Sequence, residues 1–355
     1  MRVMFPWSMP SLIYDIPDRC DTLRPDGTMA VGRNMNSLIP RATSCLTTLR
    51  PSRLAFIILL RLASVSAQAQ TPSETRGKLL EYLESGQVRD AVLLGQQSVS
   101  RWPKDAQFRH YLGVAYFKSG DSKQAQEQLA RARDLDPKDS ATHFDLALVL
   151  LSLQDYAGSA AELETSIQIM PSNALAHVLL GRAYLNSNRS VQAIDEFKTA
   201  LKLDPAIRLG HYHLGFAYAS LGRSEEAIAE YKAELQHSGE HPEVVYELGH
   251  SLLESGKRDE AINYLQRAAQ LDPKNSNVWY NLGKAQVLGG HAAQAEASLQ
   301  KSIELDAKDP SPHYQLARAL EKLGKTDEAR VERERFAELK KAQPASAGMA
   351  TARDR

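Results

Sequence analysis

The strongest constraint on the fold of this chain is a residue pattern that recurs every 34 residues between residues 72 and 343. Residues 242–275 show the pattern clearly, because one apolar stripe at helical spacing ends at Gly256 and a second stripe ends at Pro273. This unit predicts two short amphipathic helices joined in a hairpin. Neither helix can bury its apolar stripe alone, so each hairpin needs neighbours to pack against.

Counted from Pro72, the period continues without any insertion. It divides the chain into eight units: 72–105, 106–139, 140–173, 174–207, 208–241, 242–275, 276–309 and 310–343. Positions are numbered below from the first residue of each unit.

Several positions carry the same kind of residue in most units. Position 7 is Leu and position 8 is Gly or Ala in every unit after the first. Position 15 is Gly or Asn in every unit except the third, which has Gln154, and these residues tolerate the left-handed backbone that ends a helix. Position 20 is Ala or Ser, which lets two helices cross closely, and Pro at position 32 ends the second helix of five units.

This combination of period and residue types resembles the tetratricopeptide repeat family. The resemblance covers about three quarters of the chain. It implies an all-α fold, a right-handed superhelical solenoid of helical hairpins whose first helices line a concave groove. The first and last units are more polar than the rest, as expected where the stacking of repeats stops.

Residues 1–71 form a leader of different composition, with eight Arg, four Asp, no Lys and no Glu. An apolar segment at about 54–63 follows Arg53 and precedes small residues that include Ala67 and Ala69. This is the order of a secretory signal peptide, and the segment is too short for a spanning helix. We therefore predict export to the periplasm or the extracellular space, cleavage after Ala67 or Ala69, and no stable transmembrane segment.

Two features do not fit a simple signal peptide: Arg61 interrupts the apolar segment, and a long stretch precedes it. Translation from Met29 or Met35 would remove the second difficulty by making the start of the sequence a mis-extended N-terminus. A disordered cytoplasmic leader and an Arg-rich organellar presequence remain alternatives. Residues 344–355 are small and polar, and we expect a disordered tail there.

We expect no enzyme activity, cofactor or metal in the repeat body. The motifs G-x-S-x-G and G-x-G-x-x-G do not occur, and both cysteines lie in the leader. Histidine recurs at position 4, one residue per unit, so these side chains are too far apart to share a metal ion: His143, His177, His211 and His313. Residues 72–355 hold 35 of the 43 Lys and Arg and 39 of the 43 Asp and Glu. This slightly acidic balance argues against nucleic acid as a binding partner.

According to the family resemblance, positions 5 and 9 face the concave groove. The candidate contacts for a ligand are Phe144, Leu148, Val178, Arg182, Tyr212, Phe216, Tyr246, His250, Tyr280, Lys284, Tyr314 and Arg318. The first of these are mainly apolar, whereas the later ones combine tyrosines with basic residues. Tyrosine gives broad contact with a polar group at its end, and the basic residues can pair with acidic groups. Tyrosine at position 5 also serves packing in this family, so packing is the alternative role.

The function expected from these observations is a non-enzymatic scaffold for protein–protein interaction. It would bind a peptide or protein segment in the groove, with acidic groups of that segment meeting the basic residues. One alternative is an accessory factor of a cell-envelope assembly complex. A more remote alternative is a regulatory repeat subunit of a glycosyltransferase-type enzyme.

Overall fold

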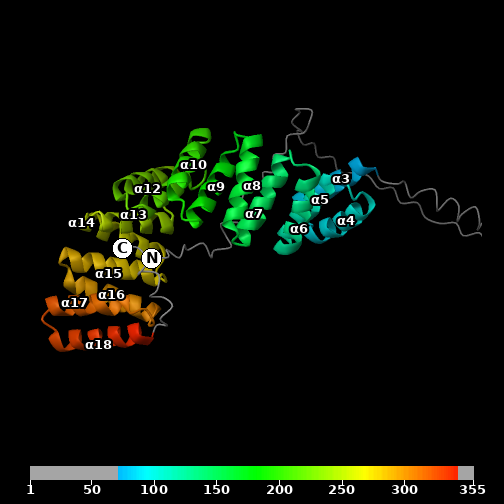
Figure 1. The fold of residues 1–355 in the computed structure, drawn as a ribbon. Coiled ribbons are helices and arrows are strands. Elements are labelled where there is room, and N and C mark those ends of the chain that lie inside the picture. Colours follow the sequence, from blue (N-terminus) through cyan, green and yellow to red (C-terminus); the bar gives the residue numbers. More distant parts are fainter. Residues whose placement is uncertain (1–70, 343–355) are drawn as a thin grey trace, which may run out of the picture.

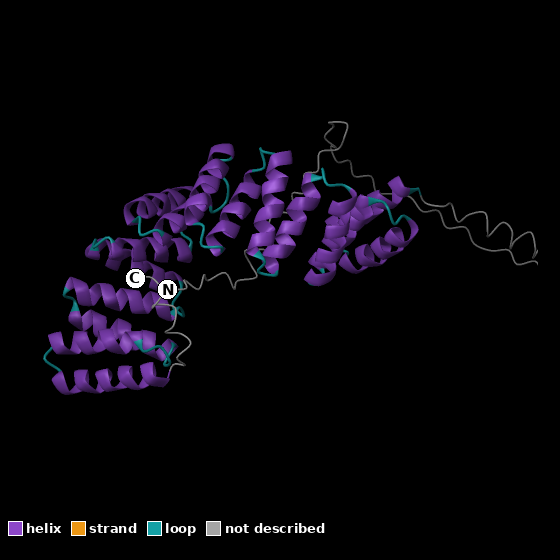
Figure 2. Ribbon diagram, viewed as in Figure 1, coloured by secondary structure: helices purple, strands orange, loops and turns teal. Residues whose placement is uncertain are grey.

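The computed structural model describes residues 71–342, so the predictions for the leader and the tail lie outside the described residues. Within 71–342 the chain forms sixteen helices and no strand, which confirms the all-α prediction (Figure 2). The helices are α3 (Pro72–Glu84), α4 (Val88–Arg101), α5 (Ala106–Lys118), α6 (Ser122–Leu135), α7 (Ser140–Ser152), α8 (Tyr156–Ile169), α9 (Ala174–Asn186), α10 (Ser190–Leu203), α11 (Gly210–Ser220), α12 (Ser224–Ser238), α13 (Pro242–Glu254), α14 (Arg258–Leu271), α15 (Ser276–Gly289), α16 (Ala292–Leu305), α17 (Ser311–Lys322) and α18 (Thr326–Ala342). Each 34-residue unit therefore contributes two helices.

Each helix packs mainly against the helix before it and the helix after it, which produces a curved array with α3 at one end and α18 at the other (Figure 1). The first helices of successive units also contact each other, most extensively α15 with α17, whereas α7 and α9 make at most a weak contact. Among the described residues, the second helices make no comparable contact with each other. The first helices are thus more closely spaced, and they form the concave side of the solenoid.

Short polar side chains set the start of many helices. Asp105, Asp139, Asn173 and Asn275, all at position 34, accept hydrogen bonds from backbone N–H groups at the start of the next unit's first helix. Unit 4 has the apolar Ile207 at this position. The next helix, α11, begins late at Gly210 without a side-chain cap. Leu209, directly before α11, has a left-handed backbone with φ of 58°, which marks this departure from the repeat.

The turn between the two helices of each unit depends on position 15. All eight residues there have positive φ, including Gln154 at 61° and Asn188 at 60°. The left-handed conformation predicted from the glycines is therefore confirmed, and it extends to the one unit that has Gln.

Small residues at position 8 allow the two helices of a hairpin to approach closely. A Cβ atom on Gly181 would lie 2.6 Å from the ring of Phe197, and one on Gly283 would lie 2.5 Å from Leu299. The opposing side chain is always at position 24. In the units with Gly at position 8, a side chain there would therefore force the opposing side chain or helix to shift, since real Cβ atoms almost never show distances this short.

One continuous hydrophobic cluster runs through units 3 to 7, and smaller clusters serve the two ends. Every residue at position 20 is buried, from Ala91 to Ala329. The terminal helix α18 buries only Ala329, and its remaining surface is largely charged. This polar last helix fits the end of a stack.

Gln154 gives a test of the turn. A non-glycine residue in the left-handed region is strained by about 1 kcal/mol, so Gln154→Gly should raise the free energy of unfolding by about 0.5–1 kcal/mol. The measurement is the midpoint of urea unfolding of the purified chain.

Gln87→Gly is the matched control, because Gln87 has φ of −79° and precedes α4 in a turn of the first unit. This change should bring no gain in stability. An equal or larger gain for Gln87→Gly would contradict the assignment of strain to Gln154.

Candidate functional site

The concave face is tied together by contacts between position 5 of one unit and position 6 of the next. His110 Nε2 lies 2.6 Å from Asp145 Oδ2, and Asn281 Nδ2 donates to the Tyr246 hydroxyl at 2.9 Å. The two pairs have the same register, 35 residues apart. Position 6 of one first helix therefore faces position 5 of the preceding one in these two pairs of units.

The predicted apolar candidates in the middle of the array are mostly part of the core. Leu148 and Val178 are only 8% and 4% exposed. Phe144 is partly buried and packs against the same cluster. These side chains hold neighbouring units together, and only Phe144 retains substantial surface toward solvent.

Tyr212 and Phe216 of α11 are each 7% exposed. The ring centroid of Tyr212 lies 6.0 Å from that of Tyr231 and 6.4 Å from that of Phe216. Burial raises the pKa of the Tyr212 hydroxyl far above its usual value, with the nearby carboxyl of Glu247 adding to the shift. Tyr212 is therefore an anchor of the packing between units 5 and 6 and offers little surface to a ligand.

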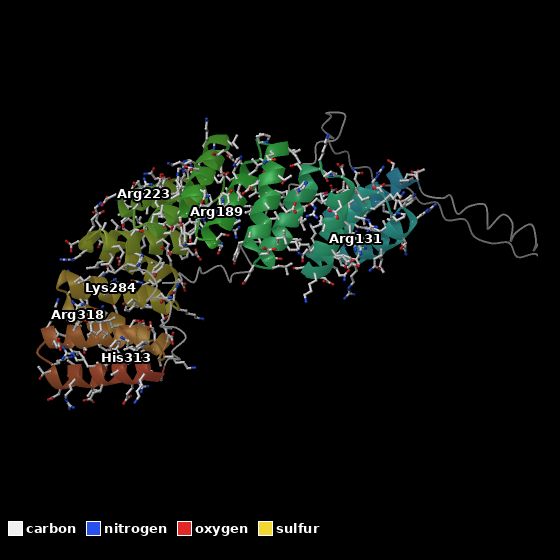
Figure 3. The ribbon with its side chains drawn as sticks, in the orientation of Figure 1. Arg131, Arg189, Arg223, Lys284, His313 and Arg318 are labelled. Carbon is white, nitrogen blue, oxygen red and sulfur yellow. The ribbon has the colours of Figure 1, made fainter. Side chains whose placement is uncertain are left out.

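Farther along the array the candidates keep more exposed surface. Tyr246 and Tyr280 are partly buried, and Tyr314 is 46% exposed with its ring 5.5 Å from that of Phe336. Lys284 and Arg318 lie on the neighbouring first helices α15 and α17 (Figure 3). These aromatic and basic side chains thus lie on the successive first helices of units 6 to 8, and their role in binding stays a prediction.

The basic candidates differ in their surroundings. Lys284 Nζ forms an ion pair of 3.0 Å with Glu254, whereas Arg318 Nη1 donates to the neutral Gln315 at 3.0 Å. Burial lowers the pKa of Arg182 to about 10. Burial, assisted by the charge of Arg182, lowers the pKa of His213 to about 3, so His213 is neutral near pH 7. His250 lies on α13 with its ring 6.2 Å from that of Tyr246, and burial lowers its pKa as well.

Glu247 is a groove residue that the sequence reasoning missed. It stands at position 6 of unit 6. Its carboxyl adds to the rise that burial causes in the pKa values of Tyr212, Tyr231 and Tyr246. The residue keeps some exposed surface, yet the packing around it raises the pKa of its carboxyl to about 7. Because only positions 5 and 9 were assigned to the groove, a charged residue at position 6 drew no attention.

The histidines at position 4 have a shared structural role. Each places Nδ1 2.6–2.7 Å from a glutamate at position 23 of the same hairpin, in the pairs His143–Glu162, His177–Glu196, His211–Glu230 and His313–Glu332. Nε2 of His143 also lies 3.1 Å from the carbonyl oxygen of Pro137, which belongs to the preceding unit. Within residues 71–342 no group of three or more His, Cys, Asp or Glu is placed to hold a metal ion.

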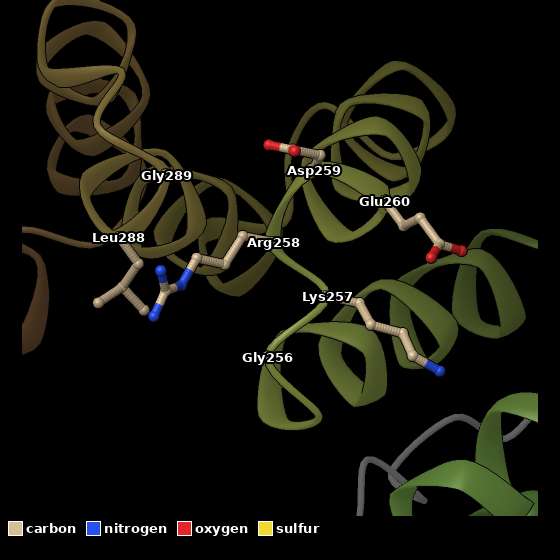
Figure 4. A pocket seen from close by; sticks show the side chains of 7 residues that line it. All are labelled: Gly256, Lys257, Arg258, Asp259, Glu260, Leu288 and Gly289. Carbon is tan, nitrogen blue, oxygen red and sulfur yellow. The ribbon is translucent and has the colours of Figure 1, made fainter.

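A pocket also lies outside the groove, at the start of α14 beside the end of α15 (Figure 4). Its lining includes Lys257, Arg258 and Asp259. Their charged ends point in different directions, and Lys257 is already paired with Glu225 at 2.6 Å. The lining does not converge on one ligand position, and the concave groove is the stronger candidate site.

The raised pKa of Glu247 predicts a pH-dependent stability. The folded state holds a proton on this carboxyl up to about pH 7, while the unfolded chain releases it near the ordinary value of 4.5, so ionisation of Glu247 destabilises the fold as pH rises through this interval. Glu247→Gln should therefore be more stable than the unchanged chain at pH 8 by about 1–3 kcal/mol, allowing for partial solvent screening.

The check is urea unfolding of both proteins at pH 4 and pH 8. The gain should shrink to near zero at pH 4, where both states of the unchanged chain are protonated. A gain of equal size at the two pH values would assign the effect to packing and contradict the electrostatic explanation.

Comparison with known proteins agrees with this geometry. Sequence models described as tetratricopeptide repeat match residues 112–174, 178–242, 252–313 and 298–331, which together make up more than half of the chain. No curated protein sequence matches the chain.

Solved structures give a similar result for the fold. The crystal structure of the APC/C hetero-tetramer Cut9–Hcn1 is similar with a TM-score of 0.53 and 17% identity, covering 75% of this chain and 52% of that chain. The present chain thus spans about half the length of that relative, and at this identity the similarity concerns the fold alone.

Two further structures match about half of the chain. YrrB, described as a TPR protein with an unusual peptide-binding site, has a TM-score of 0.47 and 18% identity over 52% of this chain and 95% of its own. MamA of AMB-1 has a TM-score of 0.43 and 29% identity over 46% and 96%. From the matched repeats and the stacked hairpins, the chain belongs to the tetratricopeptide repeat family.

Proposed function

We propose that this chain is a non-enzymatic interaction module that binds a segment of another protein on its concave face, chiefly over units 6 to 8. The observation that carries the proposal is the succession of Tyr246, Tyr280 and Tyr314 on neighbouring first helices. Each of these side chains keeps part of its surface exposed to solvent. Partly exposed tyrosines on a rigid support are common anchors for protein partners.

The rigid support comes from the repeat itself. Each of these tyrosines stands on a first helix that is packed against its own second helix and against the preceding unit. A segment lying across the groove would therefore meet a preorganised row of side chains, which reduces the entropy lost on binding. This is why the proposal is a binding surface rather than a catalytic centre.

The charges refine the expected partner. An acidic group of the partner would meet Arg318 more easily than Lys284, because Lys284 is already neutralised by Glu254 at 3.0 Å. Binding at Lys284 requires the partner to displace or share this carboxylate, which weakens the gain. Arg318 is therefore the better receptor for an acidic group.

Export of the protein is part of the proposal. The order of Arg53, apolar segment and small residues in the leader supports it. Among helices α3–α18 none combines the length and apolar character needed to span a bilayer. N-terminal sequencing of the protein isolated from its natural host should find a start near residue 68 or 70; a native chain that begins upstream of Leu54 would contradict export by cleavage.

Tyrosine substitutions test the groove. Tyr280→Ala and Tyr314→Ala should each weaken binding of a captured partner by about 1–3 kcal/mol with a small change in melting temperature, because part of each ring lies outside the core. Tyr212→Ala should instead lower stability by about 3–5 kcal/mol, since its ring is buried between two units. The measurements are calorimetric titration and thermal unfolding of the same variants.

The matched control is Tyr82→Ala, a partly buried tyrosine in the first unit outside the proposed binding region. It should leave affinity unchanged. If Tyr280→Ala and Tyr314→Ala lower the melting temperature and leave affinity intact, the tyrosines serve packing and the proposed binding region is wrong.

A further inference from the structure

His110 lies at the junction between units 2 and 3 and faces two carboxylates of unit 3. Its Nε2 is 2.6 Å from Oδ2 of Asp145 on α7, and its Nδ1 is 4.0 Å from Oδ2 of Asp139, the residue that caps the start of α7. The side chain of His110 is only 12% exposed. A doubly protonated imidazole presents an N–H group toward each carboxylate, whereas a neutral imidazole carries a proton on one nitrogen only.

Apolar packing contributes little to the attachment of the start of α5 to α7. Phe108 and Ala115, two buried apolar residues of α5, belong to the cluster of unit 1, whereas the buried apolar residues of α7 pack with α6 and with later units. Among the described residues of α5, Tyr116 and Phe117 reach the cluster shared by α6 and α7, and both stand near the end of α5. The start of α5 therefore relies on the polar contact of His110 for its attachment to α7.

The charge on His110 decides the strength of this contact. Burial alone would lower the pKa of His110, but the hydrogen bond and charge of Asp145, together with the charge of Asp139, raise it above the ordinary value of 6.5. A charged donor makes a stronger hydrogen bond to a carboxylate than a neutral donor does. The contact is therefore stronger when the imidazole carries a proton on both nitrogens.

Charged and titratable groups on the other sides of α5 are directed elsewhere. Arg76 on α3 forms an ion pair of 3.1 Å with Asp105. Arg109 of α5 donates to a backbone carbonyl oxygen and to a glutamine of α6. The ring of Tyr111 stacks against His110 with centroids 5.6 Å apart, and burial raises the pKa of its hydroxyl, so it stays uncharged. Within residues 71–342 no charged group of α4 or α6 contributes to the pKa of His110.

We propose that the contact of His110 with Asp145 and Asp139 is a pH-dependent link between units 2 and 3, which holds the start of α5 against α7 while His110 is charged. The pKa of His110 is higher in the folded chain than in the unfolded one. The link is therefore complete below about pH 6.5 and is lost as the pH rises through the raised pKa. The two carboxylates keep their charge over this interval, so the start of α5 opens more often at the higher pH.

Amide hydrogen exchange of the full chain tests this link by comparison with His110→Gln at the same pH, which cancels the pH dependence of the intrinsic exchange rate. Glutamine keeps a neutral donor but cannot carry the charge. At pH 6 the amides in the first half of α5 should exchange about 3- to 10-fold faster in His110→Gln than in the unchanged chain, as expected for one partly exposed charged pair. At pH 8.5 the two proteins should exchange at the same rate.

His177→Gln is the matched control, because His177 is comparably buried and is paired with Glu196 within its own hairpin in unit 4. It should leave exchange in α5 unchanged at both pH values. Asp145→Asn removes the partner instead of the histidine, and it should speed exchange in α5 at pH 6 but not at pH 8.5. Differences of equal size at the two pH values, or no difference at pH 6, would overturn the inference.

Discussion

The close contact between the two helices of a hairpin, where Gly at position 8 meets the side chain at position 24 in units 2 and 4 to 7, determines most of the array. Where Gly stands at position 8, the opposing Leu, Phe or Tyr at position 24 occupies the space that a Cβ atom would need. This contact sets the distance between the helices and therefore the surface on which the next unit packs. Repeated along the chain, it places the first helices on the concave side and fixes the groove.

The same contact reaches the candidate site. In unit 5 the side chain at position 24 is Tyr231, which lies under Gly215 and also faces Tyr212. Burial raises the pKa values of Tyr212 and Tyr231, and the carboxyl of Glu247 in the next unit adds to both shifts. The ionisable side chains of the concave face thus depend on the packing between the two helices of a hairpin. A substitution that alters this packing should also change their pKa values.

The sequence predicted the parts of the structure that depend on local backbone requirements. Glycine and proline at fixed intervals located the turns, and even Gln154 follows the left-handed conformation of its glycine counterparts. The late start of α11 at Gly210, after the left-handed backbone of Leu209, could not be seen in the repeat pattern.

The side-chain chemistry of the groove was less predictable, because it depends on contacts between units. Tyr212 and Tyr314 stand at equivalent positions, yet one is 7% exposed and the other 46%. The recurrence of histidine at position 4 was visible, but its partner at position 23 lies nineteen residues away on the other helix. Glu247 gave no sequence signal, since its raised pKa comes from the burial of its carboxyl in the folded chain.

The electrostatic character of the groove changes along the array. Burial, assisted by the charge of Arg182, lowers the pKa of His213, whereas one unit farther on burial raises the pKa of the Glu247 carboxyl. Farther along the array, Lys284 forms an ion pair with Glu254, and Arg318 donates a hydrogen bond to the neutral side chain of Gln315. A bound segment would therefore contact groups of different charge as well as the tyrosines. This arrangement would favour one chain direction and one register of the segment in the groove.

Hydrogen–deuterium exchange of the full chain, with and without a bound partner segment, tests the central claim that the concave face of the later units is the binding surface. Binding should slow amide exchange in the first helices α11, α13, α15 and α17 more than in the second helices α12, α14 and α16. Protection confined to the second helices, or to units 1 and 2, would contradict the account.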